Sequence, residues 1–334
     1  MCKTTREVFN TLNQQIKRML PIVEGILKGD KRSISRAISI IDNDDPDSRG
    51  IIQEIFNKTG GGRTIGFTGA GGAGKSTLIG KLAHEFQKMG HKVAVLAVDP
   101  SSPITGGAIL GDRVRMISSI DNGIYMRSMA SRGAEGGVSD SLRNVIRILD
   151  AAGYDTILVE SVGAGQLEIE ISRVVNITVV LFTPNTGDGI QAIKAGLTEI
   201  GDFYVVNKSD LEGSSFMYSI LLELIAEGSK KQVLKCSAKT GKGIRELAML
   251  LHQSLNQEKY VQKERIMVES ELQDMILNIM KEKSMEIMLQ SKQYSEYIKK
   301  ILKKEIDPYS AAAKFSDTLL LCEGSVGNKK WSKK

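Results

Sequence analysis

The sequence predicts an α/β fold with a mostly parallel sheet covered by helices on both faces and flanked by N- and C-terminal helical extensions. Short apolar strand patterns alternate with helical patterns from Arg63 to about Gln257, as in parallel sheets buried on both faces. A glycine-rich loop stands between the first of these strands and its helix. Ligands of such sheets bind at the carboxyl ends of the strands.

The strands and helices divide the chain into four expected parts. The expected strands are Ile65–Thr68, Val93–Val98, Ile124–Arg127, Thr156–Glu160, Thr178–Phe182, Tyr204–Val206 and Val233–Cys236. We expect an N-terminal helical extension (1–60), the sheet domain (61–257), a C-terminal helical arm (258–323) and a disordered tail (324–334). The Met-rich stripe of the arm suits either dimerisation or packing against the N-terminal helices.

Composition excludes several classes of protein. The chain of 334 residues is 41% hydrophobic and 25% charged, as in soluble globular proteins. Its net charge of +6 is mild and its aromatic content is 5%, so no nucleic-acid surface is indicated. Cys2, Cys236 and Cys322 are too far apart for a zinc motif. With no membrane-length apolar run and no secretory signal, we expect a cytoplasmic protein without a membrane partner.

A phosphate-binding loop follows the first strand. Gly69, Gly74, Lys75 and Ser76 match the pattern Gly-x4-Gly-Lys-[Ser/Thr]. Glycines let backbone N–H groups point at a polyphosphate, and the helix that follows adds its positive N-terminal end. The Lys75 ammonium is expected on the β- and γ-phosphates, and the Ser76 hydroxyl on Mg²⁺. The expected contacts in this loop are Gly69, Ala70, Gly71, Gly72, Ala73, Gly74, Lys75, Ser76 and Thr77.

Two further motifs indicate guanine. Asn207, Lys208 and Asp210 spell Asn-Lys-x-Asp after a strand, where the Asp210 carboxylate can accept from N1–H and the 2-amino group of guanine. Adenine lacks both donors and would leave that carboxylate unpaired. Ser237, Ala238 and Lys239 follow the last strand, where the N–H of Ala238 would meet O6 of the base. The sequence therefore predicts a P-loop GTPase domain that binds GTP and GDP.

The candidate Mg²⁺ ligands beside Ser76 are three carboxylates, of which two end strands and one, Asp112, lies in a loop. They are Asp99, Asp112 and Glu160, which supply the hard oxygens that Mg²⁺ prefers. We assign Lys75, Asp99 and Glu160 to catalysis of GTP hydrolysis, because neutralising charge on the phosphates is the main task of such a site. No residue is identified as the one that positions water, so slow hydrolysis accelerated by a partner is expected.

Longer stretches carry a family resemblance. They are 99–116, Arg132-Gly133 with Gly136-Gly137, 151–155, 160–166 and 187–196. At these residues the chain resembles the GTPase chaperones of adenosylcobalamin-dependent methylmalonyl-CoA mutase, formerly described as arginine/ornithine transport kinases, within the metallochaperone GTPases. Gly71, Glu135, Leu167 and Asn185 depart from the residues usual in that family.

The resemblance implies a homodimeric GTPase that gates cofactor delivery to an adenosylcobalamin-dependent acyl-CoA mutase and protects that mutase from inactivation. It implies that Ser76, Asp99, Asp112 and Glu160 belong to the magnesium shell or its switch. It also implies a partner switch over 187–196, with Asp188, Gln191 and Lys194 facing the mutase.

Three alternatives stay open. A P-loop kinase would transfer phosphate to an acceptor, although the guanine motif argues against it. A metallochaperone GTPase for a different client would need a cluster of Cys and His, whereas His84, His91 and His252 are isolated in the sequence. A scaffold could bind nucleotide only to stay folded.

Overall fold

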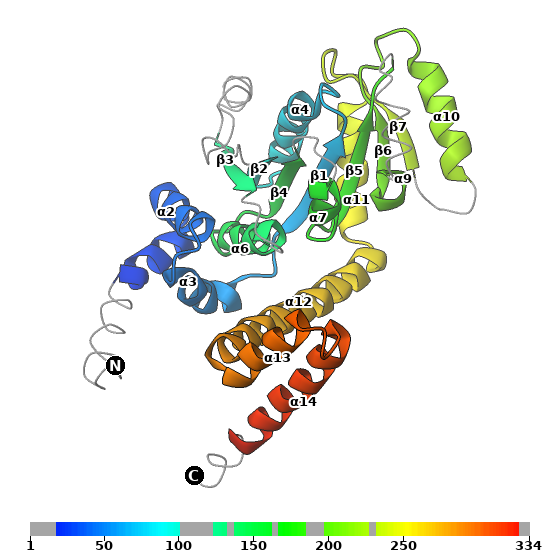
Figure 1. Ribbon diagram of the computed structural model, residues 1–334. Coiled ribbons are helices and arrows are strands. Elements are labelled where there is room, and N and C mark those ends of the chain that lie inside the picture. The colour runs from blue at the N-terminus through cyan, green and yellow to red at the C-terminus, as the bar shows by residue number, and fades with distance from the viewer. Residues whose placement is uncertain are drawn as a thin grey trace. The chain divides into compact units, whose positions relative to one another are not determined.

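The protein has the predicted α/β architecture. The computed structural model describes residues 18–100, 123–131, 137–161, 166–184, 197–226 and 232–326. Its seven strands are all parallel, in the order β3-β2-β4-β1-β5-β6-β7 (Figure 1). They are β1 (Arg63–Gly69), β2 (Val93–Pro100), β3 (Tyr125–Ser131), β4 (Thr156–Ser161), β5 (Ile177–Phe182), β6 (Phe203–Val206) and β7 (Gln232–Lys235).

Helices precede, connect and follow these strands. A helix over residues 18–27 comes first among the described residues. The others are α2 (Lys31–Asp42), α3 (Asp47–Ile55), the short 3-10 helix η1 (Phe56–Lys58), α4 (Lys75–Lys88), α6 (Gly137–Ala151), α7 (Gln166–Ser172), α9 (Leu197–Ile200), α10 (Ser214–Ala226), α11 (Ile244–Leu255), α12 (Glu258–Gln290), α13 (Lys292–Leu302) and α14 (Pro308–Val326).

Helices cover both faces of the sheet (Figure 1), and apolar side chains fill the space between them and the strands. On one face, α4 and α11 pack against Phe67, Val95 and Leu158 of the central strands. On the other face, α2, α3, α6 and α7 form a core with Leu96 and Val159. All residues of β4 and β5 are buried, as expected for strands that are covered on both sides.

The N-terminal helices share a core with the sheet. In α2 the buried residues recur at helical spacing: Ile34, Ala37, Ile38 and Ile41. Asp30 caps this helix, and its carboxylate accepts from the Ser33 N–H at 2.8 Å and the Ser33 hydroxyl at 2.7 Å. These bonds lower the pKa of Asp30, because they stabilise the charged form.

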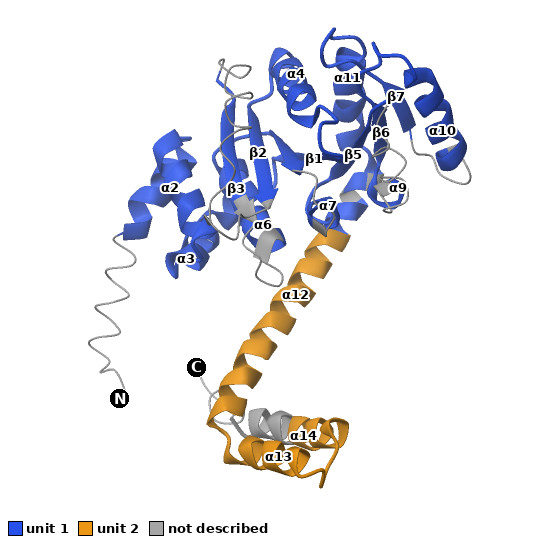
Figure 2. Ribbon diagram, turned by 45° about the horizontal axis from the view of Figure 1, so that its top comes forward, with its two compact units in different colours: residues 1–265 blue, residues 266–334 orange. Residues whose placement is uncertain are grey.

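The chain divides into two compact units, residues 1–265 and 266–334 (Figure 2). The start of α12 belongs to the first unit. There Tyr260 is buried, and Lys263 Nζ lies 3.1 Å from Asp202 Oδ2. In the second unit, Phe315 of α14 packs near Tyr294 and Tyr297 of α13. Helix α14 ends at Val326, inside the range where we expect a tail.

Across the residues that the structure describes, no helix is long and apolar enough to span a bilayer.

A single carboxylate fixes the glycine hinge before β1. Asp150 near the end of α6 accepts from the N–H groups of Gly60 at 2.6 Å, Gly61 at 3.2 Å and Gly62 at 2.7 Å. A carboxylate near a helix C-terminus is normally disfavoured by the helix dipole. The three N–H donors offset that cost and hold the chain where it enters the sheet.

We expect Asp150→Ala to lower the free energy of unfolding by about 1–3 kcal/mol, because three N–H groups lose a charged acceptor. Urea unfolding of the full chain, followed by circular dichroism, measures the change. Glu54→Ala is the control, since Glu54 is exposed on α3 and an exposed site of this kind changes stability by about 0.5 kcal/mol or less. Equal effects of the two substitutions would contradict the role of Asp150.

Candidate guanine-nucleotide site

The phosphate loop needs glycine at its two ends. A Cβ at Gly69 would lie 2.4 Å from the Leu181 carbonyl oxygen of β5, and a Cβ at Gly74 would lie 2.6 Å from Asn207 Nδ2. Both residues also have left-handed backbones, with φ of 140° at Gly69 and 84° at Gly74. Any side chain at either position would push the loop away from the strands that support it.

The lysine of the motif is held by its own loop. Lys75 is buried, and its Nζ donates to the carbonyl oxygens of Gly69 at 2.6 Å and Ala70 at 3.0 Å. These two carbonyl oxygens position the ammonium over the loop. Phosphate oxygens are stronger partners than neutral carbonyls because the resulting hydrogen bonds join two charges. The loop thus presents a positive charge suited to a polyphosphate.

Helix α4 begins directly on this loop. Gly74 is its N-cap residue, and within the described part of the chain no side chain caps the helix, so its first N–H groups suit an anion. Ser76 in the first turn donates its hydroxyl to Glu160 Oε1 at 2.6 Å. Glu160 is buried on β4, beside the register partner Phe67 on β1. The phosphate loop and the end of β4 therefore meet.

Asp99 lies at the neighbouring strand end. Ala97 of β2 is the register partner of Glu160, and side chains alternate along a strand. Asp99 and Glu160 therefore project from the face of the sheet that α4 covers, and both are buried. With the Ser76 hydroxyl they form a set of hard oxygen donors that suits Mg²⁺. Within the described ranges, no group of three or more His, Cys, Asp or Glu side chains is arranged to hold a metal ion by itself.

A buried amide joins the guanine loops to the phosphate loop. Asn207 is 1% exposed and donates its Nδ2 to the Ala73 carbonyl at 2.8 Å. Its Oδ1 accepts from the Ala238 N–H at 3.2 Å. Asn207 therefore connects the phosphate loop to the second guanine loop.

Asp210 is oriented by a serine from the second guanine loop. Ser237 donates its hydroxyl to Asp210 Oδ1 at 2.5 Å and accepts from the Thr240 N–H at 3.2 Å. The Ser237 hydrogen bond lowers the pKa of Asp210 below its ordinary value of 3.8. The carboxylate therefore stays ionised, as it must to accept two hydrogen bonds from guanine.

A hollow of about 270 Å³ lies between these loops. The residues that line it are Gly74, Thr77, Asn207, Lys208, Asp210, Leu211, Ala238 and Lys239. Lys208 has a left-handed backbone (φ 55°), and its Nζ donates to the Gly72 carbonyl at 2.8 Å. Such strain in a residue other than glycine is frequent at functional sites. The apolar wall formed by Leu211 was missed from the sequence, although this residue directly follows the motif aspartate.

Some predicted site residues lie outside the described residues. They are Asp112 of the candidate metal set and Asp188, Gln191 and Lys194 of the candidate partner switch. The structure brings together the remaining predicted residues, which come from the phosphate loop, the ends of β2 and β4, and the two guanine loops. Their roles stay predictions.

Comparisons with known proteins identify the family. A family model described as methylmalonyl Co-A mutase-associated GTPase MeaB matches residues 34–292. The chain belongs to this family. A putative GTPase of Pyrococcus horikoshii is 41% identical over 304 residues, covering 87% of this chain and 95% of that protein. GTPase ArgK of Escherichia coli is 35% identical over 251 residues, covering 71% of this chain and 74% of that protein.

Two further similarities extend this result. The mitochondrial methylmalonic aciduria type A homolog of Mus musculus is 33% identical over 247 residues, covering 67% of this chain and 60% of that protein. The solved structure of a LAO/AO transport system kinase has a TM-score of 0.66 at 23% identity, covering 90% of this chain and 97% of that one, and thus shares the fold. As a MeaB-family member, the chain binds guanine nucleotide and is a GTPase.

We expect Ser237→Ala to raise the pKa of Asp210. In the unchanged protein the lowered pKa keeps Asp210 ionised as the pH falls. Guanine binding is therefore lost only when the pH drops below this pKa. In Ser237→Ala the loss of binding should begin at a higher pH. A ¹³C NMR titration of the Asp210 carboxyl and GDP affinity as a function of pH measure the two effects.

Ser209→Ala is the matched control for this titration. The Ser209 hydroxyl lies in the same motif but is buried and has no hydrogen-bond partner among the residues that the structure describes. Its removal should leave the pKa of Asp210 unchanged. An Asp210 pKa that is the same in Ser237→Ala and the unchanged protein would contradict the assignment.

Proposed function

We propose that the chain is a GTP-hydrolysing chaperone that gates cofactor loading and protects an adenosylcobalamin-dependent acyl-CoA mutase, with methylmalonyl-CoA mutase as the first candidate client. The observation that carries this proposal is the family match over residues 34–292, whose description names a mutase-associated GTPase. The name of the mouse relative, which refers to methylmalonic aciduria, points to the same chemistry.

The roles proposed for the site follow from its geometry. The loop N–H groups and Lys75 bind the phosphates, while Asp210, Lys208 and Lys239 bind the base. The Ala238 N–H, which donates to Asn207 Oδ1, is shared between that oxygen and O6 of the base. During hydrolysis, water attacks the γ-phosphorus and the bond from that phosphorus to the bridging oxygen of GDP breaks. Lys75 then stabilises the charge that develops on the phosphate oxygens. Asn207 keeps the phosphate and base sites at a fixed separation.

Magnesium is the metal that the donor set suits. Ser76, Asp99 and Glu160 would hold the ion, with Asp112 as a further candidate outside the described residues. When bound, Mg²⁺ neutralises charge on the β- and γ-phosphate oxygens. Glu160 already accepts the Ser76 hydroxyl at 2.6 Å, so the structure keeps two of these donors in contact.

We expect Lys75→Ala to lower the rate of GTP hydrolysis on the order of 10²–10³-fold, because a charged donor to the transition state is lost. Phosphate release from GTP by the purified protein measures the rate. Lys81→Ala is the control, since Lys81 is exposed on the same helix and should leave this basal rate unchanged. Normal turnover in Lys75→Ala would contradict the role of this lysine.

The chaperone function is tested by the effect of the client. GTP and ATP hydrolysis are measured with the protein alone and with a cobalamin-dependent acyl-CoA mutase from the same organism. We expect turnover of GTP only, and a faster rate with the mutase present. If GTP turnover does not respond to the mutase, the protein is still a GTPase but this mutase is not its client. Phosphate found on an acceptor instead of in solution would favour a kinase.

Homodimerisation is proposed from the second compact unit. Several apolar residues of α12 in this unit are exposed, among them Leu272 at 57%, Ile276 at 48% and Leu289 at 81%. Monomeric soluble proteins rarely leave large contiguous apolar patches in water. A second copy of the chain would cover Leu272 and Ile276, which lie one turn apart and share a face of the helix.

We expect the protein to migrate in light-scattering chromatography with twice the mass of one 36.5 kDa chain. The double substitution Leu272→Glu with Ile276→Glu should shift it to the mass of one chain, because it places charges in the interface. Gln273→Glu with Asn278→Glu adds the same charge at exposed polar positions of α12 and should leave the mass unchanged. A single-chain mass for the unchanged protein would contradict the dimer.

A further inference from the structure

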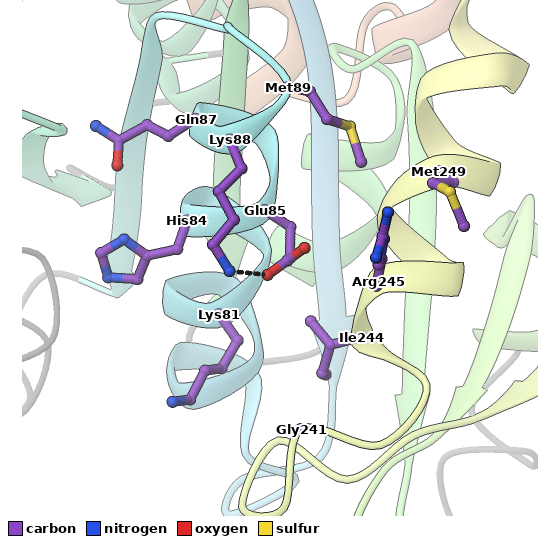
Figure 3. A pocket seen from close by; sticks show the side chains of 10 residues that line it. All are labelled: Lys81, His84, Glu85, Gln87, Lys88, Met89, Gly241, Ile244, Arg245 and Met249. Carbon is purple, nitrogen blue, oxygen red and sulfur yellow. Dashed lines mark hydrogen bonds and ion pairs between the residues drawn. The ribbon is translucent and has the colours of Figure 1, made fainter.

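A groove of about 1040 Å³ lies between α4 and α11, outside the nucleotide site (Figure 3). Helix α4 supplies Lys81, Glu85 and Lys88 to its lining, and α11 supplies Arg245 and Met249. The two helices pack against each other through buried apolar side chains below the groove. The proposed nucleotide chemistry uses none of the residues that line the groove.

The groove carries excess positive charge. Lys81, Lys88 and Arg245 line it as cations, and Glu85 is the one acidic side chain of its described lining. Glu85 is already paired with Lys88, whose Nζ lies 2.6 Å from Glu85 Oε1. Lys81 and Arg245 are exposed, and neither forms an ion pair in the part of the chain that the structure describes. Two cations are thus left to attract an anionic ligand.

Apolar side chains accompany these cations. Met249 is 40% exposed, and Ile244 forms a buried part of the lining. Met89, which directly follows α4, also lines the groove (Figure 3). Methionine side chains adapt to different partner shapes and are frequent at protein-binding surfaces. A surface with both features suits a peptide that carries carboxylates and an apolar side chain.

The walls of the groove lead directly to the nucleotide loops. Helix α4 begins at Lys75 of the phosphate loop, and α11 begins at Ile244, shortly after the guanine loop of Ser237 and Ala238. Gly241, between that loop and α11, also lines the groove. A ligand in the groove would therefore contact two helices, α4 and α11, whose first residues adjoin the nucleotide loops.

We propose that the α4–α11 groove docks an acidic segment of the client protein. This inference rests on the proposed chaperone function. The chain's own termini do not fit the groove's charge, because residues 1–17 contain Lys3, Arg6 and Lys17 with one acid, Glu7, and residues 327–334 contain four lysines and no acid. Charge complementarity therefore favours a segment of another protein, with carboxylates opposite Lys81 and Arg245.

The test reverses the charge of these two residues. Lys81→Glu with Arg245→Glu should weaken binding of the cobalamin-dependent acyl-CoA mutase by about tenfold or more, because two attractive contacts become repulsive. The acceleration of GTP hydrolysis by the mutase should be lost in parallel at subsaturating mutase. Basal GTP hydrolysis and the melting temperature of the variant should stay unchanged. Interferometry with immobilised mutase and excess GDP measures the affinity.

Two further variants make the test specific. Lys31→Glu with Arg36→Glu makes the same change in net charge at exposed positions of α2 and should leave mutase affinity unchanged. Lys81→Gln with Arg245→Gln removes the charges without reversing them. It should weaken binding less and make the affinity less sensitive to salt, and it provides a readout if the reversed variant does not fold.

Each outcome bears on the proposal. If the charge-reversed and neutral variants bind the mutase with full affinity, the groove is not the client-binding site. The proposed chaperone function would be unaffected by that result. Equal loss in the α2 variant would also overturn it, because the attraction would then be a general effect of charge. A changed oligomeric mass in the groove variants would assign the groove to a contact between copies of this chain and overturn a client site. If the unchanged protein does not bind the mutase, the proposed function fails and the groove proposal fails with it.

Discussion

The nucleotide site depends on one buried amide. Asn207 bonds to Ala73 in the phosphate loop and to Ala238 in the second guanine loop, so three segments far apart in the sequence are held by one side chain. A buried amide that loses either partner is left unsatisfied, which costs about 1–3 kcal/mol. Glycine at position 74 is required by the same contact, since a Cβ there would overlap Asn207 Nδ2. The loops that bind the base and the loop that binds the phosphates therefore form one structural unit.

The parallel sheet explains why these segments meet. Strands β1, β2, β4, β6 and β7 all point the same way, so their carboxyl ends form one edge. The phosphate loop, Asp99, Glu160 and both guanine loops each follow or end one of these strands. The strand order places β4 between β1 and β2, which brings Glu160 to the hydroxyl of Ser76. The strand order of the sheet thus determines that Glu160 is the carboxylate that contacts the phosphate loop.

Much of this arrangement could be predicted from the sequence because its signals are local. The glycine pattern, the Asn-Lys-x-Asp motif and the apolar strands each depend on neighbouring residues, and the strand ends differ from the prediction by a few positions. The tie between Asp150 and Gly60–Gly62 joins groups 88 to 90 residues apart, and no local pattern indicates it. The Ser237–Asp210 bond was missed for the same reason, although both residues were assigned to the site.

The α4–α11 groove follows from the same architecture but has no sequence motif. Lys81 and Arg245 come from helices separated by most of the sheet domain, and each alone resembles an ordinary exposed cation on a helix. They share a surface only because α4 and α11 cover the same face of the sheet. Since both helices begin at nucleotide loops, a partner on this surface would be coupled to the site through packed helices and not through a flexible linker. A client in the groove would influence hydrolysis if it bound one arrangement of these helices and loops more tightly than another.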